Sequence, residues 1–274
     1  MKNIFDRVSA QCSEIVTKNY STSFSLGIRF LDRTYRDPIY AIYGFVRLAD
    51  EIVDSFHDYD KPSLLAKFRR DCMEAIEYRI SLNPILNAFQ QVVHQFNIQM
   101  ELINLFLQSM EMDLQKEEYT PEKYEQYILG SAQVVGLMCL HVFVNGDETN
   151  YQRLKEPAMK LGAAFQKVNF LRDLKADYFL LNRSYFPGVN LAAFSEQEKL
   201  IIQQQITEDF DASLEGILQL PKSSRKGVYL AYIYYRALFE KIKKKSATQI
   251  MDRRIRISNM HKFALMCGSW VQGK

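Results

Sequence analysis

The sequence predicts an all-α protein, and three observations support this prediction. Apolar residues recur at helical spacing along almost the whole chain. Glycine and proline, which interrupt helices, number only 11 and 7 and fall mainly between these periodic segments. Hydrophobic residues make up 47% of the chain, enough for a large core with an apolar pocket beside it. Because no repeat, low-complexity tract or linker divides the chain, we expect residues 1–274 to form a single helical domain.

Five helices are expected in the N-terminal half. The first spans residues 4–19, and the stripe that we expect to face the core consists of Ile4, Val8, Cys12 and Ile15. Asp37-Pro38 marks the start of the second helix, because proline is well placed in a first helical turn. The others span residues 63–81, 85–96 and 100–114.

The C-terminal half begins with a helix whose start is marked by Thr120 as a cap and by Pro121 at the first helical position. This helix runs to about residue 144 and carries four small residues that either let another helix approach closely or border a pocket: Gly130, Ser131, Ala132 and Gly136. A turn at residues 145–148 leads to the helix that contains residues 161–181. Two more helices are expected at residues 195–218 and 226–244.

Composition narrows the function classes. Lys plus Arg minus Asp plus Glu is 35 − 32, or +3, so the chain lacks the strong positive charge typical of nucleic-acid binding. The four cysteines are far apart and form no C-x-x-C pair, as expected for a reduced, cytoplasmic protein. The N-terminus lacks a signal-peptide core, and the longest apolar run, Val134–Val144, is too short to span a bilayer. We therefore expect a cytoplasmic location, with at most peripheral contact at the inner face of the membrane.

Two apolar helices carry polar stripes that point to chemistry. In residues 161–181, one narrow stripe is formed by Gln166, Asn169, Asp173 and Asp177. In residues 41–54, one face at the same spacing is formed by Tyr43, Arg47, Asp50 and Asp54. A single D-x-x-x-D pattern is common on solvated helix faces, but two of them on apolar helices in one chain favour a function.

Oxygen ligands one helical turn apart suit Mg²⁺, which is usually held by a few carboxylates together with substrate phosphate oxygens. Two such helices facing each other across a cavity would hold several Mg²⁺ ions and, through them, a diphosphate. Arg47 and Arg172 would neutralise the remaining charge.

Five motifs in order resemble those of the squalene and phytoene synthases, which join two prenyl diphosphates head to head. These motifs are Tyr20-Ser21-Thr22-Ser23-Phe24; R-x-x-D-E-x-x-D from Arg47 to Asp54; Tyr127 followed by Val135-Gly136-Leu137-Met138; F-Q-x-x-N-x-L-R-D-x-x-x-D from Phe165 to Asp177; and Arg183-x-Tyr185-Phe186-Pro187. The resemblance covers about residues 15–190 and departs from the family pattern at Tyr20, where His is frequent, and at Lys175-Ala176, where Gly-Glu is usual.

The resemblance implies the all-α isoprenoid synthase bundle around a central cavity, and a role for each matching residue. It places Mg²⁺, or Mn²⁺ in its stead, on Asp50, Asp54, Asn169 and Asp173. It assigns chemistry to Tyr127, Arg47 and Asp177. Together with the basic tail, it gives as substrate-binding residues Ser21, Ser23, Phe24, Tyr43, Arg47, Gln166, Arg172, Tyr235, Arg253 and Lys262.

Three of these assignments have alternatives. Ser21 and Ser23 are also suited to capping the next helix. The tyrosines of residues 226–244 are also typical core residues. The basic tail with Arg253 and Lys262 also fits a solvated face or a membrane-surface patch.

The implied activity is a prenyltransferase reaction that joins two geranylgeranyl diphosphates into phytoene through a cyclopropyl intermediate, without NADPH. The pattern Y-x-x-x-x-A-x-x-V-G-L-M favours phytoene; C30 dehydrosqualene or squalene synthesis from farnesyl diphosphate is the near alternative. A non-catalytic helical assembly protein is the distant one, but the intact acidic stripes argue against it. The expected partners are prenyl diphosphates, with no nucleic acid, and the expected state is a monomer or weak dimer.

Overall fold

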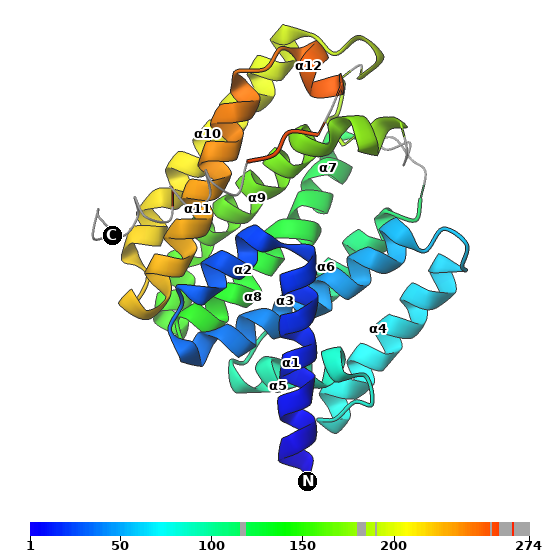
Figure 1. Ribbon diagram of the computed structural model, residues 1–274, viewed down its shortest axis with the longest axis vertical. Helices are drawn as coiled ribbons and strands as arrows, with labels where there is room; N and C mark the ends of the chain where they lie inside the picture. Colours follow the sequence, from blue (N-terminus) through cyan, green and yellow to red (C-terminus); the bar gives the residue numbers. More distant parts are fainter. Residues whose placement is uncertain (116–118, 180–184, 190, 253, 258–264, 266–274) are drawn as a thin grey trace.

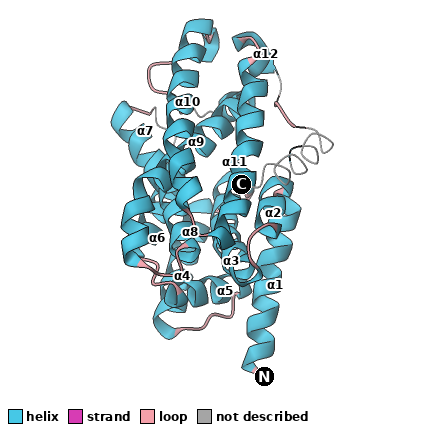
Figure 2. Ribbon diagram, turned by 90° about the vertical axis from the view of Figure 1, so that its left-hand side faces the viewer, coloured by secondary structure: helices cyan, strands magenta, loops and turns pink. Residues whose placement is uncertain are grey.

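The computed structural model describes residues 1–115, 119–179, 185–189, 191–252, 254–257 and 265. All regular structure within these residues is helical (Figure 2). The elements are α1 (Lys2–Tyr20), α2 (Thr22–Arg29), α3 (Arg33–Ser55), α4 (Lys61–Tyr78), α5 (Pro84–Gln95), α6 (Met100–Met112), α7 (Pro121–Ile128), the π-helix η1 (Leu129–Gln133), α8 (Val134–Phe143), α9 (Glu148–Phe179), the 3₁₀ turn η2 (Leu191–Ala193), α10 (Glu196–Gln219), α11 (Lys222–Lys243) and α12 (Ala247–Asp252). The all-α prediction is confirmed for these residues.

Side-chain caps fix where several helices begin. Asn83 accepts hydrogen bonds from the first backbone N–H groups of α5, and Thr120 accepts one from Lys123 N at the start of α7. Ser195 and Glu198 form a reciprocal capping box at the start of α10. These starts lie within a residue or two of the predicted ones, because a cap is a local signal that the sequence displays directly.

The predicted start of α3 at Asp37-Pro38 was wrong. The helix begins at Arg33, because the Asp32 carboxylate accepts hydrogen bonds from both the backbone N–H and the hydroxyl of Thr34, at 3.0 and 2.8 Å. Pro38 lies inside the helix and is buried. Asp32 is the true cap, and proline is tolerated near the N-terminus of a helix, where it removes one hydrogen bond.

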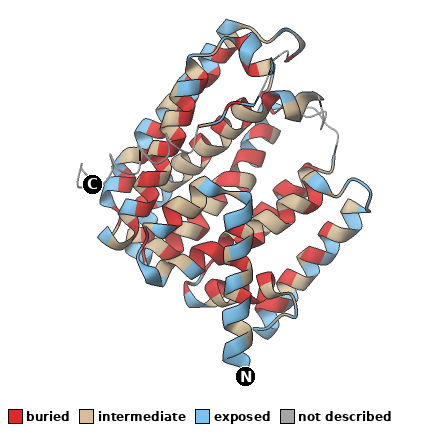
Figure 3. Cartoon of the chain, in the orientation of Figure 1, coloured by how far each residue is buried: buried red, intermediate tan, exposed pale blue. Residues whose placement is uncertain are grey.

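The predicted core-facing stripe of α1 was also wrong. Ile4, Val8 and Ile15 are 56%, 44% and 59% exposed. The buried face of α1 instead consists of Ser9, Ser13 and Thr17. Figure 3 shows α1 largely exposed or intermediate along its visible length.

Small side chains on this face let α1 pack closely on α3 and α5. A Cβ added at Gly44 of α3 would lie 3.1 Å from Ser13 Oγ. The hydroxyls are satisfied within α1, since Ser9 Oγ and Thr17 Oγ1 donate to carbonyls one turn earlier, each at 2.9 Å. Close approach therefore decided the buried face, and hydrophobicity did not.

Helix α8 contacts α3, α6, α9 and η1. In Figure 1, α1 and α3 to α6 (blue to green) occupy one part of the bundle and α9 to α12 (green to orange) the other, with α2 packed against α11. Aromatic rings fill the core beneath α3, where Phe45 stacks on Phe89 at a centroid distance of 3.9 Å. This arrangement sets the two acidic helices, α3 and α9, on either side of α8.

The helical stretch Pro121–Phe143 is long and apolar enough, by length and composition, to cross a membrane, with a hydropathy of 1.4. The apolar run Val134–Val144 is only the C-terminal part of this stretch, because the helix continues from α7 through η1 into α8. The most apolar 18-residue segment of this stretch is 56% buried inside the protein. Core helices of globular proteins have the same composition, and the packing of this stretch against α3, α6 and α9 is of that kind.

Candidate active site

A cavity of about 340 Å³ lies between α2, α3, α8, α9, α10 and α11. Its walls are mainly apolar, but Arg47 and Asp50 of α3 line it together with Gln166 and Asn169 of α9. From Asn169 the lining continues down α9 to Leu154. At 1.5 Å per residue, this distance is about 22 Å. The cavity is therefore deep and apolar, with its charged groups at one end.

On the α3 side, Arg47 forms ion pairs with Asp50 and with Glu51. Its guanidinium also lies over the ring of Tyr20, 4.2 Å from the centroid. Tyr20 is the position where the family pattern often has His, so the departure adds a cation–π contact to Arg47. Arg47 Nε is buried and has no hydrogen-bond partner within the described residues.

Burial, followed by the charge of Asp54, raises the pKa of the Asp50 carboxyl to about 7, although Arg47 opposes this shift. Asp113 and Glu51 add to the negative potential. Asp50 therefore lies where negative charge is in excess, and binding of a cation there would stabilise its ionised form.

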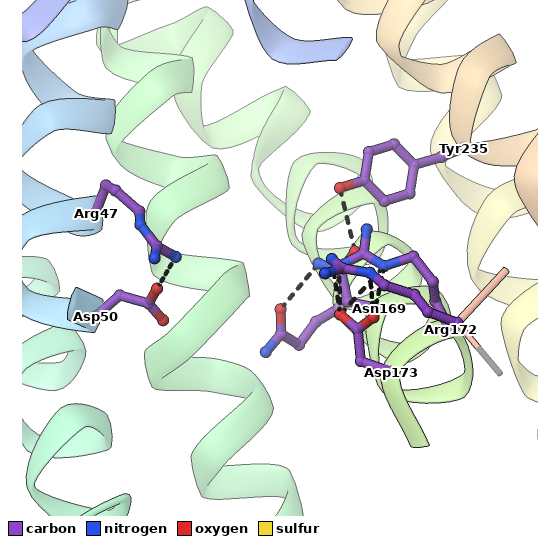
Figure 4. A network of polar contacts seen from close by, with 8 residues as sticks. Arg47, Asp50, Asn169, Arg172, Asp173 and Tyr235 are labelled. Carbon is purple, nitrogen blue, oxygen red and sulfur yellow. Dashed lines mark hydrogen bonds and ion pairs between the residues drawn. The ribbon is translucent and has the colours of Figure 1, made fainter. Parts of the chain in front are cut away.

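On the α9 side, Asp173 is held between two guanidinium groups (Figure 4). Arg172 Nη2 lies 2.6 Å and Arg254 Nε 2.8 Å from its carboxylate oxygens. Asn169 Oδ1 accepts a hydrogen bond from the Tyr235 hydroxyl at 3.3 Å, and Asn169 Nδ2 donates to Gln166 at 3.5 Å. Figure 4 shows this group across a gap from Arg47 and Asp50.

These residues fit a magnesium site that substrate completes. Asp50 and Asn169 line one cavity from opposite helices, and their oxygen atoms are of the kind that Mg²⁺ prefers. In the described part of the chain, no three His, Cys, Asp or Glu side chains are grouped closely enough to hold a metal. Mg²⁺ usually keeps several waters or phosphate oxygens as ligands, so Asp50 and Asn169 in the lining, with Asp54 and Asp173 one turn further along α3 and α9, match its chemistry.

Four aromatic rings join α2, α3, α9 and α11 at the charged end of the cavity. Phe165 stacks on Tyr235 at 3.9 Å, and Phe24 lies 5.7 Å from Tyr43 and 5.9 Å from Tyr235. Burial raises the pKa of Tyr43 to about 12 and also raises the pKa of Tyr235, so both are neutral phenols. All four line the cavity. The substrate-binding role of Phe24, Tyr43 and Tyr235 stays a prediction.

Tyr127 also lines the cavity, and it is tied to a carboxylate behind the wall. Its hydroxyl donates to Asp113 Oδ2 at 2.8 Å, and the Tyr185 hydroxyl donates to Asp113 Oδ1 at 3.3 Å. Burial and then the charge of Asp113 raise the pKa of Tyr127 well above its usual value.

Several of the predicted site residues either do not line the cavity or lie outside the described residues. Ser21 caps α2 by accepting from Phe24 N at 3.2 Å, so the capping alternative is confirmed for it. Ser23 is partly buried in the first turn of α2. Asp54, Arg172 and Asp173 do not line the cavity. The charge of Asp54 acts on Asp50, which lines it, and Asp173 pairs with Arg172 one turn beyond Asn169 on α9. The Asp177 side chain, Arg253 and Lys262 lie outside the described residues.

Arg254 was missed as a site residue. The sequence shows a basic cluster at residues 253–256, but only the three-dimensional contact singles out the guanidinium that reaches Asp173. The segment that carries Arg254 is anchored on both sides, because Lys175 Nζ donates to Asp252 O and Lys241 Nζ donates to Arg256 O, each at 2.7 Å.

The chain is similar to known proteins over most of its length. The squalene/phytoene synthase family model matches residues 17–261. The chain belongs to this family. Members of the squalene/phytoene synthase family are prenyltransferases, and the fold expected from the resemblance is the one observed.

Among curated relatives, phytoene synthase 1 of Solanum lycopersicum is 25% identical over 88% of this chain, which spans 62% of that protein. A phytoene synthase of Arthrospira platensis is 26% identical, covering 84% of this chain and 82% of its own length. The fold is similar to that of a dehydrosqualene synthase crystallised with a ligand, with a TM-score of 0.84, 22% identity and 98% of each chain covered. Squalene synthase HpnC from Alicyclobacillus acidocaldarius gives a TM-score of 0.76 at 20% identity, covering 88% of this chain and 95% of its own.

Proposed function

We propose that this protein condenses two geranylgeranyl diphosphates head to head into phytoene, with Mg²⁺ as cofactor and without NADPH. The observation that carries the proposal is one deep apolar cavity whose charged end is lined from opposite helices by Arg47, Asp50 and Asn169. Such a site matches the two parts of a prenyl diphosphate, a long apolar chain and a compact polyanion. The named phytoene synthases among the relatives favour the C40 product.

We expect the residues of the site to have separate roles in this reaction. Asp50, Asp54, Asn169 and Asp173 would hold Mg²⁺, which would draw charge from the departing diphosphate. Arg47 and Arg172 would pair with diphosphate oxygens not bound to the metal. The aromatic rings at the charged end would close the cavity to water and present electron-rich faces to a developing allylic cation.

The first test is incubation of the protein with Mg²⁺ and either geranylgeranyl or farnesyl diphosphate, with and without NADPH, followed by mass analysis of extracted hydrocarbons. A C40 product without NADPH is expected. A C30 product would keep the mechanism but change the substrate, and NADPH dependence would separate squalene from dehydrosqualene.

Asp50→Asn combined with Asp173→Asn tests the metal ligands in the same assay. The double variant is expected to lose activity, since each helix then loses one of its proposed carboxylate ligands. Absence of product and of diphosphate release from the native protein with either substrate would favour the non-catalytic assembly protein instead.

A further inference from the structure

The proposed condensation requires a base, because a carbon cation must lose a proton to close the cyclopropane ring and another to give the final double bond. Two side chains, Asp113 and Tyr127, are hydrogen-bonded to each other at the cavity wall. Only Tyr127 lines the cavity; Asp113 is buried behind it at the end of α6.

We propose that Asp113 is a positioning residue and the final proton acceptor for Tyr127, so that the two form a proton relay. This inference rests on the proposed function. The Tyr127 hydroxyl points its proton at Asp113 Oδ2, 2.8 Å away, which leaves the phenolic lone pairs for a proton from the substrate.

The proposed proton transfer uses both Tyr127 and Asp113. A C–H bond of the cation breaks, and its electron pair closes the ring. The proton goes to the Tyr127 oxygen while the hydroxyl proton of Tyr127 passes to Asp113. The step removes the positive charge of the carbon cation and the negative charge of the Asp113 carboxylate together. The neutral Asp113 then returns its proton to the released diphosphate.

Tyr127 alone is a poor base. Its pKa lies well above the usual value, because of burial and then the charge of Asp113, so it is a neutral phenol at working pH. A neutral phenol that accepts a proton must give up its own, and the hydrogen-bonded carboxylate is the acceptor in reach.

The surroundings hold this pair in one geometry. Tyr185 donates to the other oxygen of Asp113 at 3.3 Å, and Phe170 stacks on the Tyr185 ring at 4.1 Å. Tyr119 packs edge-on against Tyr127 at 5.4 Å. Rotation of the Asp113 carboxylate away from Tyr127 would cost the Tyr185 hydrogen bond as well.

The test compares Asp113→Asn, Tyr127→Phe and the double variant in single turnovers with geranylgeranyl diphosphate and Mg²⁺. Diphosphate release and the ratio of hydrocarbon to prenyl alcohol are measured. We expect diphosphate release to persist in Asp113→Asn while hydrocarbon formation falls about 10²-fold, the typical contribution of general acid–base catalysis. The alcohol fraction should rise, because a cation that keeps its proton is captured by water.

The double variant should be no slower in hydrocarbon formation than the slower single variant, since the two residues act in series. Tyr124→Phe is the matched control, because Tyr124 lies one turn away on α7, is buried and does not line the cavity. It should keep the native product ratio.

Three outcomes would overturn the relay: a native product ratio in Asp113→Asn, single-variant effects that multiply in the double variant, or an equal loss of diphosphate release and hydrocarbon. If Asp113→Asn does not fold by circular dichroism, Tyr127→Phe must by itself show the shifted ratio, and a native ratio there is decisive against the relay. A native protein that makes no hydrocarbon would contradict the proposed function itself, which separates the two failures.

Discussion

Asp173, one of the proposed metal ligands, already forms ion pairs within the protein. Two guanidinium groups form ion pairs with its carboxylate. One belongs to the neighbouring Arg172 and the other to Arg254, which is 81 residues away in the sequence. A metal ion that binds Asp173 must displace part of this pairing. The freed guanidinium groups would then lie beside the metal, where a diphosphate needs cationic partners.

Arg254→Gln therefore tests whether Arg254 serves the substrate or competes with the metal. We expect KM for the prenyl diphosphate to rise about tenfold, the loss of one charge-assisted hydrogen bond, as measured by diphosphate release. Arg256→Gln, an exposed residue on the same segment, should leave KM unchanged. A lower Mg²⁺ requirement in Arg254→Gln, with unchanged KM, would identify a competitor instead.

Asp50 predicts a pH dependence of metal binding. Its pKa of about 7 means that below pH 7 protons compete with Mg²⁺ for the carboxylate, so affinity should rise from pH 6 to pH 8. The stability of the protein without metal has the opposite pH dependence. Because the pKa is raised from 3.8, Asp50 contributes stability at low pH that is lost as pH rises from about 4 to about 7.

The measurement is the rise in melting temperature caused by Mg²⁺ with inorganic diphosphate, which should be larger at pH 8 than at pH 6. Asp50→Asn should remove the difference between the two pH values. A stabilisation by Mg²⁺ that is equal at both pH values in the native protein would show that Asp50 does not bind the metal.

At the scale of elements, close contacts between helices decide which faces are buried. Gly162 of α9 meets Ala132 of η1 so closely that an added Cβ would lie 2.6 Å from the Ala132 carbonyl oxygen. An added Cβ at Gly130 would lie 2.6 Å from the Leu105 carbonyl oxygen of α6. Both sequence interpretations of the small residues around 130–136 therefore hold, because the segment that packs closely also lines the cavity.

The same principle gives a stability prediction for α1. Ser13→Leu should lower the free energy of unfolding by about 1–3 kcal/mol, since the larger side chain overpacks against Gly44. Ile15→Ser, on the exposed face two residues away, should change it by less than about 0.5 kcal/mol. Urea unfolding measures both. A large loss in Ile15→Ser with no loss in Ser13→Leu would restore the apolar stripe as the buried face.

For the whole molecule, we expect the depth of the cavity to select the length of the substrate. The lining along α9 passes from Asn169 through Phe165 and Ala158 to Leu154, so a bulky side chain at Ala158 would block the deeper part. The charged end at Asn169, about three turns away, would be untouched.

Ala158→Phe is accordingly expected to reduce condensation of geranylgeranyl diphosphate about tenfold relative to farnesyl diphosphate. Product mass in a competition between the two substrates measures this ratio. Glu156→Phe, on the exposed side of the same helix, serves as the control and should keep the native ratio. An unchanged ratio in Ala158→Phe would mean that the prenyl chain ends above residue 158.

The sequence by itself determined the helical class, most helix starts and the two polar stripes, because caps and helical spacing are local properties of the chain. It also carried the family resemblance, through five ordered motifs. Only the tertiary structure decided that Ser13 rather than Ile15 is buried, that Arg254 reaches Asp173 and that Asp113 lies behind Tyr127. These are contacts between segments distant along the chain, and they depend on how closely the helices approach, which no local pattern encodes.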